Sequence, residues 1–351
     1  MDLVALKPVM KRLKYGGIRA GLEAIALSRA ASLFPAAAGR GVIFTLHHVL
    51  PKQAPTRFDP NAILSITPEF LETAILTSRE RGMTPAHLHE LPSLLADPAD
   101  KRKFVAFTLD DGYRDNAEFA APVFRKYGVP YTIFITAGFV ERSRSIWWET
   151  AAALTRKASS FRFDFGHGPE RVKAATTAQK FAAFDRLASF VGTADEDEAV
   201  RRLDDAAASH RIDPMAIVEA LIMNAAELRR LANDPLVHFG AHTLTHVNLR
   251  RVSAERLLNE IEGSTLAVEK YVGCRPRSFS YPYGWSSAAG EREALATAEA
   301  DFPVAVTTQP GVLDPSSIAR PTMLPRVSLN GLYQKKRYVA ALLSGLPFRF
   351  M

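Results

Sequence analysis

The sequence predicts an α/β fold in which parallel β-strands are joined by crossover helices. Short apolar runs rich in β-branched and aromatic residues alternate with helical patterns along most of the chain, and this alternation is typical of a parallel sheet. With 351 residues, the chain is long enough for one barrel-sized domain or for two smaller domains. Its apolar content of 47% and charged content of 23% are those of an ordinary soluble globular protein.

Six strands are expected from the apolar runs. They lie at 41–46, 104–109, 131–136, 236–241, 278–281 and 304–307. A helix is expected over 68–81, because Thr67 suits an N-cap and Gly82 stands where glycine often follows a helix end. Further helices are expected to end near Gly128 and to cover 253–271.

Residues 145–235 depart from this alternation. They are rich in Ala, Arg and Asp and mostly helical in pattern, with a short hairpin expected around 161–168. We interpret them as a helical insertion that forms a lid or a wall of the substrate site. The acidic run 195–198 and the acidic pair 204–205 are predicted to lie on solvated helix faces.

The net charge of +7 is concentrated near the N-terminus. Residues 1–40 contain seven basic and two acidic side chains, and so carry five of the seven net charges. This segment lacks the uninterrupted apolar core of a secretory signal, because Glu23 and Arg29 interrupt it. We favour a solvated helix packed against the domain, with contact to an anionic membrane surface as the alternative.

The sequence excludes several classes of protein. No run of about 18 uninterrupted apolar residues predicts a transmembrane helix, and no recognisable motif accompanies the basic residues as it would in a nucleic-acid-binding protein. The single cysteine, Cys274, excludes an intramolecular disulfide and a thiolate metal site. We therefore expect a cytoplasmic protein, with peripheral membrane contact left open.

Two adjacent carboxylates follow the strand predicted at 104–109. Asp110 and Asp111 stand where a buried strand gives way to a loop, and barrel active sites gather at the carboxyl ends of parallel strands. Gly112 permits a sharp exit from the strand. Alone, the pair would be read as a polar turn with a helix N-cap. Because adjacent carboxylates repel each other, a cation beside one of them would relieve the conflict.

Two histidines follow the strand predicted at 236–241. His242 and His246 are four residues apart, so on a helical turn they would face the same way. A lone histidine of this kind is usually structural. Two imidazoles and a carboxylate, however, can hold a divalent metal and leave positions open for water and substrate. The combination predicts a hydrolytic metal site.

Asp-Asp-Gly after a strand, followed by His-Thr-x-x-His, resembles the polysaccharide deacetylases of the fourth carbohydrate esterase family, over about residues 40–330. The resemblance implies a distorted (β/α) barrel with a helical insertion. It also implies a divalent ion bound by Asp111, His242 and His246, with Asp110 as the catalytic base. The ion is expected to be Zn²⁺, with Co²⁺, Ni²⁺ and Mn²⁺ as alternatives.

The resemblance also suggests a domain organisation. We expect a basic N-terminal helical segment over 1–40, the deacetylase barrel with its insertion over 41–330, and a C-terminal helical tail over 331–351.

The segment 279–284 resembles the third motif of the family. By that match, the backbone amide of Tyr283 would help to hold the oxyanion. The usual arginine of this motif, which braces the catalytic Asp, is missing here. Arg326 is our candidate for its replacement, with an exposed arginine after a proline as the alternative.

A late Leu-x-His motif, which usually supplies the general acid, is not apparent. Instead, Leu46-His-His-Val stands at the end of the first strand and resembles a segment of the circularly permuted branch of the family, known from biofilm poly-N-acetylglucosamine deacetylases. His47 matches the acid of that branch. His48 is expected to point away or to contact substrate at the rim.

These residues together predict an N-deacetylase. Asp110 would take a proton from water, Tyr283 would hold the oxyanion and His47 would protonate the leaving amine. Trp147, Trp148 and Tyr283 could present flat faces to a sugar ring, although the two tryptophans could equally anchor the insertion.

Three functions are compatible with this pattern. The leading hypothesis is removal of N-acetyl groups from an N-acetylated amino sugar in a polysaccharide, oligosaccharide or glycoconjugate. The alternatives are a metal-dependent hydrolase of a non-sugar amide or imide, and a catalytically silent carbohydrate-binding barrel. The intact set of Asp110, Asp111, His242 and His246 argues against the silent barrel.

Overall fold

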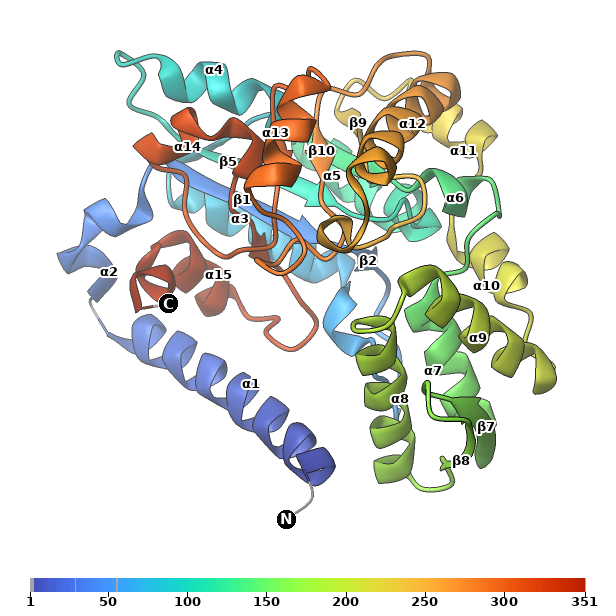
Figure 1. Cartoon of the computed structure of the whole chain (residues 1–351). Coiled ribbons are helices and arrows are strands. Elements are labelled where there is room, and N and C mark those ends of the chain that lie inside the picture. The colour runs from blue at the N-terminus through green and yellow to red at the C-terminus, as the bar shows by residue number, and fades with distance from the viewer. Residues whose placement is uncertain (1–2, 29, 55, 351) are drawn as a thin grey trace.

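The computed structural model describes residues 3–28, 30–54 and 56–350. Its centre is a curled, eight-stranded parallel sheet in the order β11-β10-β9-β6-β5-β1-β12, with β4 paired to the first half of β5 (Figure 1). The strands are β1 (Gly41–Leu46), β4 (Met83–Pro85), β5 (Lys103–Leu109), β6 (Tyr131–Ile135), β9 (Val237–Ala241), β10 (Phe279–Ser280), β11 (Ala305–Val306) and β12 (Val327–Ser328).

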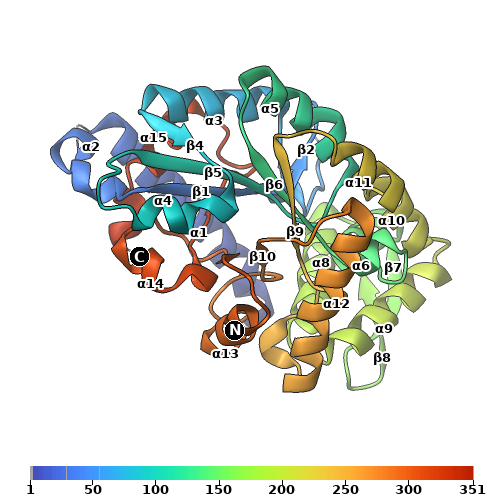
Figure 2. The same cartoon turned by 90° about the horizontal axis from the view of Figure 1, so that it is seen from above.

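The two ends of the sheet are joined by the chain segment that leads into β12. Leu324 forms a parallel bridge with Val306 of β11, and three residues later Val327 pairs with Phe44 of β1. Seen from above, the strands curl around a centre while α3, α5, α11 and α12 follow the outer side (Figure 2). The predicted distorted barrel is confirmed.

The six predicted strands are all present, with ends within one residue of the predicted ones. The strands β4 and β12 were not predicted, because three and two residues are too few to show a period. A separate two-stranded sheet pairs β2 (His48–Val49) with β3 (Ser65–Ile66).

Alternate residues of the strands face two different cores. Val42, Phe44 and Leu46 of β1 belong to the larger core, which packs against the helices. Ile43 of the same strand belongs to a second core that combines side chains of several strands across the sheet: Phe104, Ala106, Phe134, Val304, Val306 and Leu324. Because non-neighbouring strands meet in it, this second core fills the inside of the curled sheet.

The outer helices follow the predicted signals closely. In α3 (Pro68–Glu80), the hydroxyl of Thr67 accepts a hydrogen bond from the amide of Phe70, and Gly82 beyond the helix end has φ = +71°. The other outer helices are α5 (Ala121–Tyr127), α11 (Ala225–Leu231) and α12 (Ala254–Val272). Shorter helices between strands are α4 (Leu91–Ala96), α6 (Ala137–Val140), α13 (Glu291–Glu299) and α14 (Pro315–Ala319).

The stretch predicted as an insertion is mostly helical and contains α7 (Trp147–Lys157), α8 (Thr177–Val191), α9 (Glu196–Ser209) and α10 (Pro214–Leu221). Its part from α7 to α9 lies below the sheet in Figure 1, whereas α11, within the predicted range 145–235, packs on α12 as an outer helix of the barrel. The hairpin of this stretch joins β7 (Ser160–Asp164) to β8 (Pro169–Lys173). The predicted hairpin is present, but the predicted range 161–168 ends too soon: it covers the first strand and the turn with the left-handed Gly166 and Gly168, and the second strand follows.

At the N-terminus, α1 (Leu3–Leu27) packs against α15 (Lys336–Leu343) near the other end of the chain. Leu22, Tyr338 and Ala341 form a small core between them. The helix α2 (Ala30–Leu33) follows; residues 1, 2 and 29 of the predicted basic segment and residue 351 of the predicted tail lie outside the described residues.

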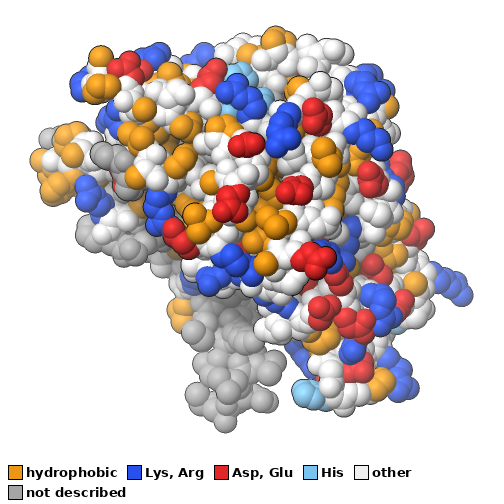
Figure 3. Space-filling view, turned by 45° about the horizontal axis from the view of Figure 1, so that its top comes forward, with side chains coloured by type: hydrophobic (Ala, Val, Ile, Leu, Met, Phe, Trp, Pro, Cys, Tyr) orange, Lys and Arg blue, Asp and Glu red, His pale blue; other side chains and the backbone are white. Residues whose placement is uncertain are grey.

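No helix in the described part of the chain is long and apolar enough to span a membrane. On the face drawn in Figure 3, acidic and basic side chains are interspersed.

Three partly buried histidines form a cluster near the start of β9. The ring of His89 lies 4.3 Å from that of His238 and 5.2 Å from that of His87, centre to centre. Within the described residues, the Nδ1 atoms of all three are buried without a hydrogen-bond partner. Burial lowers the pKa of His89 to about 4 and that of His238 to about 3.

This cluster should make the fold sensitive to acid. Above the ordinary histidine pKa of about 6.5 both folded and unfolded chains are neutral here, but below it the unfolded chain takes up protons that the folded cluster resists. The free energy of unfolding, measured with denaturant, should therefore fall as the pH drops from 7.5 to 5. His238→Asn cannot be protonated, so its free energy of unfolding should fall less over the same range. Equal pH dependence in both proteins would contradict this role.

Candidate active site

The predicted catalytic and metal-binding residues meet at one end of the sheet, and all but Arg326 follow the carboxyl end of a strand. Asp110 and Asp111 follow β5, His242 and His246 follow β9, and Tyr283 follows β10. Arg326 immediately precedes β12, and His47 follows β1. The curled sheet therefore brings residues from five strands to one mouth, as is usual for barrel enzymes.

Arg326 and Asp110 form a buried ion pair inside this mouth. Two parallel hydrogen bonds of 2.7 Å run from the guanidinium to the two oxygens of Asp110. The remaining donors of Arg326 reach the hydroxyls of Thr108 and Ser280 and the carbonyl of Thr307, at 2.8–3.0 Å. The side chain of Arg326 is 0% exposed. The alternative of an exposed arginine is therefore wrong.

Burial alone would raise the pKa of Asp110, but the charge and hydrogen bonds of Arg326 outweigh it and hold that pKa well below the ordinary value. Asp110 is thus ionised over the whole physiological pH range.

Asp111, His242 and His246 form a buried cluster with the composition of a metal site. The Nε2 atoms of His242 and His246 lie 3.6 and 3.4 Å from Oδ1 of Asp111. One ligand atom from each residue lies within 4.8 Å of the others. Neither oxygen of Asp111 has a hydrogen-bond partner among the described residues, although both are buried. An unpaired buried carboxylate is costly, so the cluster fits a cation.

The ionisation of these groups supports the same conclusion. Burial, and after it the nearby charge of Asp110, raises the pKa of Asp111 well above its ordinary value. Burial also lowers the pKa of His242 and of His246. Both rings are therefore neutral, which is the form that binds metal, and a bound cation would stabilise the carboxylate of Asp111.

The orientation of His242 also suits a ligand. Its Nδ1 donates to the carbonyl of Ser280 at 2.6 Å, which leaves the lone pair of Nε2 directed at the cluster. Histidines that bind metals usually donate their other ring nitrogen to a carbonyl or a carboxylate in this way.

The two histidines do not lie on a helical turn, contrary to our expectation. Thr243 and His246 adopt left-handed backbone conformations, with φ of 66° and 56°, in a loop after β9. The hydroxyl of Thr243 accepts a hydrogen bond from the amide of His246 at 2.9 Å. This loop, rather than helical periodicity, brings the two rings together.

Glu260 of α12 holds this loop, and sequence reasoning did not identify it. Its fully buried carboxylate accepts hydrogen bonds from the amides of Leu244 and Thr245 at 2.8 and 2.9 Å and from the hydroxyl of Thr245 at 2.7 Å. Arg256 balances its charge at 2.7 Å. The only signal in the sequence was a glutamate on the apolar side of a long helix.

The adjacent histidines His47 and His48 point to opposite sides of the sheet. His48 contacts Asp115 at 2.5 Å through Nδ1 and stacks on Tyr113, and it is 5% exposed. His47 lies close enough to the mouth for the charge of Asp110 to raise its pKa and that of Arg326 to lower it. Burial lowers its pKa to about 4. The predicted contact of His48 with substrate is at odds with its burial. His48 begins β2, and adjacent residues of an extended chain point to opposite sides.

Tyr283 links the mouth to the insertion. It has a left-handed backbone with φ = 63°, and no hydrogen-bond acceptor for its amide is found among the described residues. Its hydroxyl donates to Glu196 at 2.5 Å and accepts from the indole of Trp147 at 2.9 Å. Glu196 is 4% exposed, so our expectation that the whole run 195–198 is solvated is wrong at this residue. No pattern in the run distinguishes Glu196 from its neighbours.

Trp148 packs the insertion against the barrel beside the metal cluster, with its ring centre 4.9 Å from that of His246. Its indole donates to the hydroxyl of Tyr113 at 3.0 Å and packs on Phe139, and the residue is 7% exposed. This position fits the anchor interpretation and is at odds with a sugar-stacking role for Trp148. Trp147 is only partly buried.

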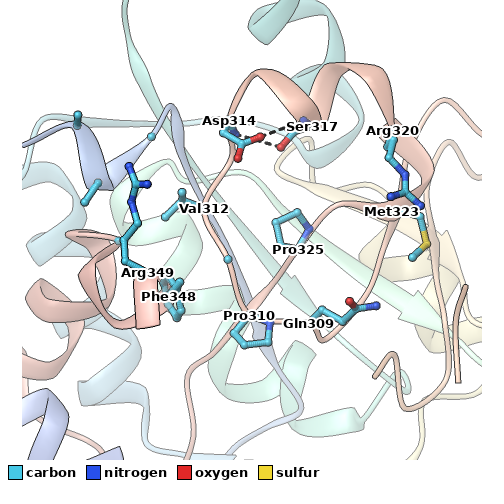
Figure 4. Close-up of a pocket in the computed structure, with 15 residues that line it drawn as sticks. Gln309, Pro310, Val312, Asp314, Ser317, Arg320, Met323, Pro325, Phe348 and Arg349 are labelled. Carbon is cyan, nitrogen blue, oxygen red and sulfur yellow. Dashed lines mark hydrogen bonds between the residues drawn. The ribbon is translucent and has the colours of Figure 1, made fainter. Parts of the chain in front are cut away.

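A surface pocket of about 420 Å³ lies at the other end of β1, near Gly39, Pro310, Val312 and Phe348 (Figure 4). Gly39 precedes β1, whereas His47 of the mouth follows it, and none of the predicted site residues lines the pocket. The pocket is therefore separate from the candidate site.

Comparison with known families identifies the chain. A model of the polysaccharide deacetylase family matches residues 97–178 and 200–300, just over half of the chain. The chain belongs to the polysaccharide deacetylase family. The matched segments include Asp110, Asp111, His242, His246 and Tyr283, whereas His47 and Arg326 lie outside them. The family supports a deacetylase hydrolase acting on an acetylated saccharide.

Solved deacetylase structures share the fold. The Streptococcus pyogenes deacetylase PplD, in complex with acetate, is similar with a TM-score of 0.51 and 13% identity, over 84% of this chain and 92% of that one. The polysaccharide deacetylase BC0361 from Bacillus cereus has a TM-score of 0.51 and 14% identity, over 86% and 68%.

A de-N-acetylase from Aggregatibacter actinomycetemcomitans has a TM-score of 0.50 and 11% identity, over 82% of this chain and 94% of that one. Sequence comparison with curated proteins finds no match.

The ion pair should be strongly coupled. Arg326→Met leaves Asp110 buried without a partner and should lower the free energy of unfolding by about 3–5 kcal/mol. The double variant Asp110→Leu with Arg326→Met removes both charges and should be more stable than the sum of the single effects predicts. Denaturant unfolding in the presence of a chelator gives the free energy of unfolding of the wild type, the two single variants Asp110→Leu and Arg326→Met, and the double variant. Additive losses would show that the two residues do not stabilise each other.

Proposed function

We propose that this protein is a metal-dependent N-deacetylase that removes acetyl groups from an N-acetylated amino sugar in a polysaccharide, oligosaccharide or glycoconjugate. The observation that carries the proposal is the unequal environment of two adjacent carboxylates. Asp110 is paired with Arg326, whereas Asp111 lies beside two neutral histidines and its oxygens have no hydrogen-bond partner among the described residues. This difference makes one carboxylate a base and the other a ligand.

The metal ligands in this proposal are Asp111, His242 and His246. Two imidazoles and one carboxylate suit Zn²⁺, and Co²⁺, Ni²⁺ and Mn²⁺ are alternatives. When bound, such an ion would polarise the acetamide carbonyl and lower the pKa of water.

Asp110 is the proposed catalytic base. Because Arg326 keeps its carboxylate ionised, Asp110 is ready to accept a proton from the attacking water. Arg326 also fixes the direction of the carboxylate, since all five N–H donors of the guanidinium are used within the mouth. The water can then add to the acetamide carbon.

Tyr283 and His47 complete the proposed reaction. The amide of Tyr283 has no acceptor among the residues that the structure describes, and it would stabilise the oxyanion that develops on the carbonyl oxygen. His47 would protonate the leaving amine. With its pKa lowered to about 4, His47 is neutral at pH 7, so it must first receive a proton, and the carboxyl group of Asp110 is the nearest source that the mechanism supplies.

The partly buried Trp147 and Tyr283 are the proposed aromatic contacts for the sugar at the metal.

Acetate release tests the function directly. Protein stripped with a chelator should release no acetate from N-acetylglucosamine oligomers, and addition of Zn²⁺, Co²⁺, Ni²⁺ or Mn²⁺ should restore it.

Asp110→Asn should lose about 10²-fold or more in kcat while still binding one metal ion, whereas His242→Ala should lose the ion. Metal binding without acetate release would favour a non-sugar amide hydrolase. A wild type that neither binds metal nor releases acetate would favour a silent carbohydrate-binding barrel.

The two adjacent histidines should differ in their effect on rate. His47→Ala should lower kcat by about 10²-fold or more if this ring is the acid. His48→Asn keeps a donor for Asp115 and should change kcat little, although it should lower the melting temperature because Asp115 is buried. The reverse pattern of rates would move the acid role to His48.

A further inference from the structure

Trp285 leaves an indole at the surface close to the active site. It is 53% exposed, whereas Trp148 is 7% exposed and Trp147 is partly buried. An exposed indole gains little from burial on folding, and rigid exposed aromatic side chains are common binding contacts. None of the roles described above uses Trp285.

The backbone of Trp285 is held firmly. Its carbonyl accepts hydrogen bonds from the amides of Ala288 and Ala289 at 2.8 and 3.0 Å. The preceding Gly284 has φ = 66°, and a Cβ atom there would lie 2.5 Å from the amide nitrogen of Thr308. The backbone is therefore held on both sides of Trp285, by the close approach of Gly284 to Thr308 before it and by the turn to Ala288 and Ala289 after it.

The indole ring is also fixed on one face. It stacks on the ring of Tyr283 with centres 5.3 Å apart and planes inclined by 26°. Tyr283 is itself held by Glu196 and Trp147 through its hydroxyl. Since one face of Trp285 is covered and half of the residue remains exposed, the indole offers a preformed apolar surface that loses little entropy on binding.

The stack leads from the proposed metal ligands to the surface. The centre of the Tyr283 ring lies 5.1 Å from that of His246. Trp285 therefore stands one aromatic ring further from the metal cluster than Tyr283. A step of this size is comparable with the length of one sugar unit in a saccharide chain.

We propose that Trp285 is a stacking subsite for the sugar next to the one that is deacetylated. The apolar C–H face of a pyranose ring fits the flat indole. The inference rests on the proposed deacetylase function and deepens it: the preferred substrate is a saccharide chain of at least two units, not a monosaccharide.

Saccharide binding tests the subsite independently of turnover. Pentamers of N-acetylglucosamine, one β-1,4-linked and one β-1,6-linked, are titrated against the metal-loaded protein by calorimetry and tryptophan fluorescence, with monomeric N-acetylglucosamine for comparison. At least one pentamer should bind the wild type about tenfold more tightly than the monomer, which corresponds to about 1.4 kcal/mol. Trp285→Ala should remove this advantage. Trp285→Phe should keep part of it and lose the fluorescence change.

Leu266→Ala is the matched control, because Leu266 is 63% exposed on α12 and belongs to no part of the mouth. It should bind the pentamer as the wild type does. Equal binding of the pentamer by the wild type and Trp285→Ala would overturn the subsite, as would a wild type that binds neither pentamer better than the monomer. If a pentamer binds through Trp285 but releases no acetate, the proposed function fails and the subsite stands.

Discussion

The ion pair between Arg326 and Asp110 is the interaction on which the rest of this structure depends. Arg326 lies between Leu324, which bridges to β11, and Val327, which pairs with β1, so the segment that joins the ends of the sheet also supplies the positive charge at its centre. Neither charge would be tolerated alone at this depth. The contact that ionises Asp110 therefore also holds the closing segment against the end of β5.

The pair also decides how the neighbouring carboxylate behaves. Asp110 and Asp111 are both buried, but the pKa of the first is lowered and that of the second is raised. Arg326 is directed entirely at Asp110 and neighbouring polar groups, which leaves the oxygens of Asp111 for a cation. Two identical side chains next to each other in sequence thereby acquire different chemistry from their partners.

The strands and the site could largely be predicted from the sequence, while the loops that shape the site could not. Apolar runs with turn residues between them located six strands, and strand alternation separates His47 from His48. The contact of Arg326 with Asp110 was expected only because a motif lacked its arginine. Four non-glycine residues at the mouth, Asp111, Thr243, His246 and Tyr283, have left-handed backbones. Such conformations are set by tertiary contacts and leave no periodic pattern in the sequence.

The chain order of the site has a consequence for biosynthesis. His47, Asp110 and the metal ligands are all synthesised before Arg326, which lies in the segment that closes the sheet. On the ribosome, a nascent chain that ends before this segment has Asp110 without its arginine, and its sheet has no segment that links β11 to β1. Asp110 and Arg326 can form their buried ion pair only when the segment that leads into β12 docks. The chain should therefore reach its native state in one late step, after nearly all of it has been made.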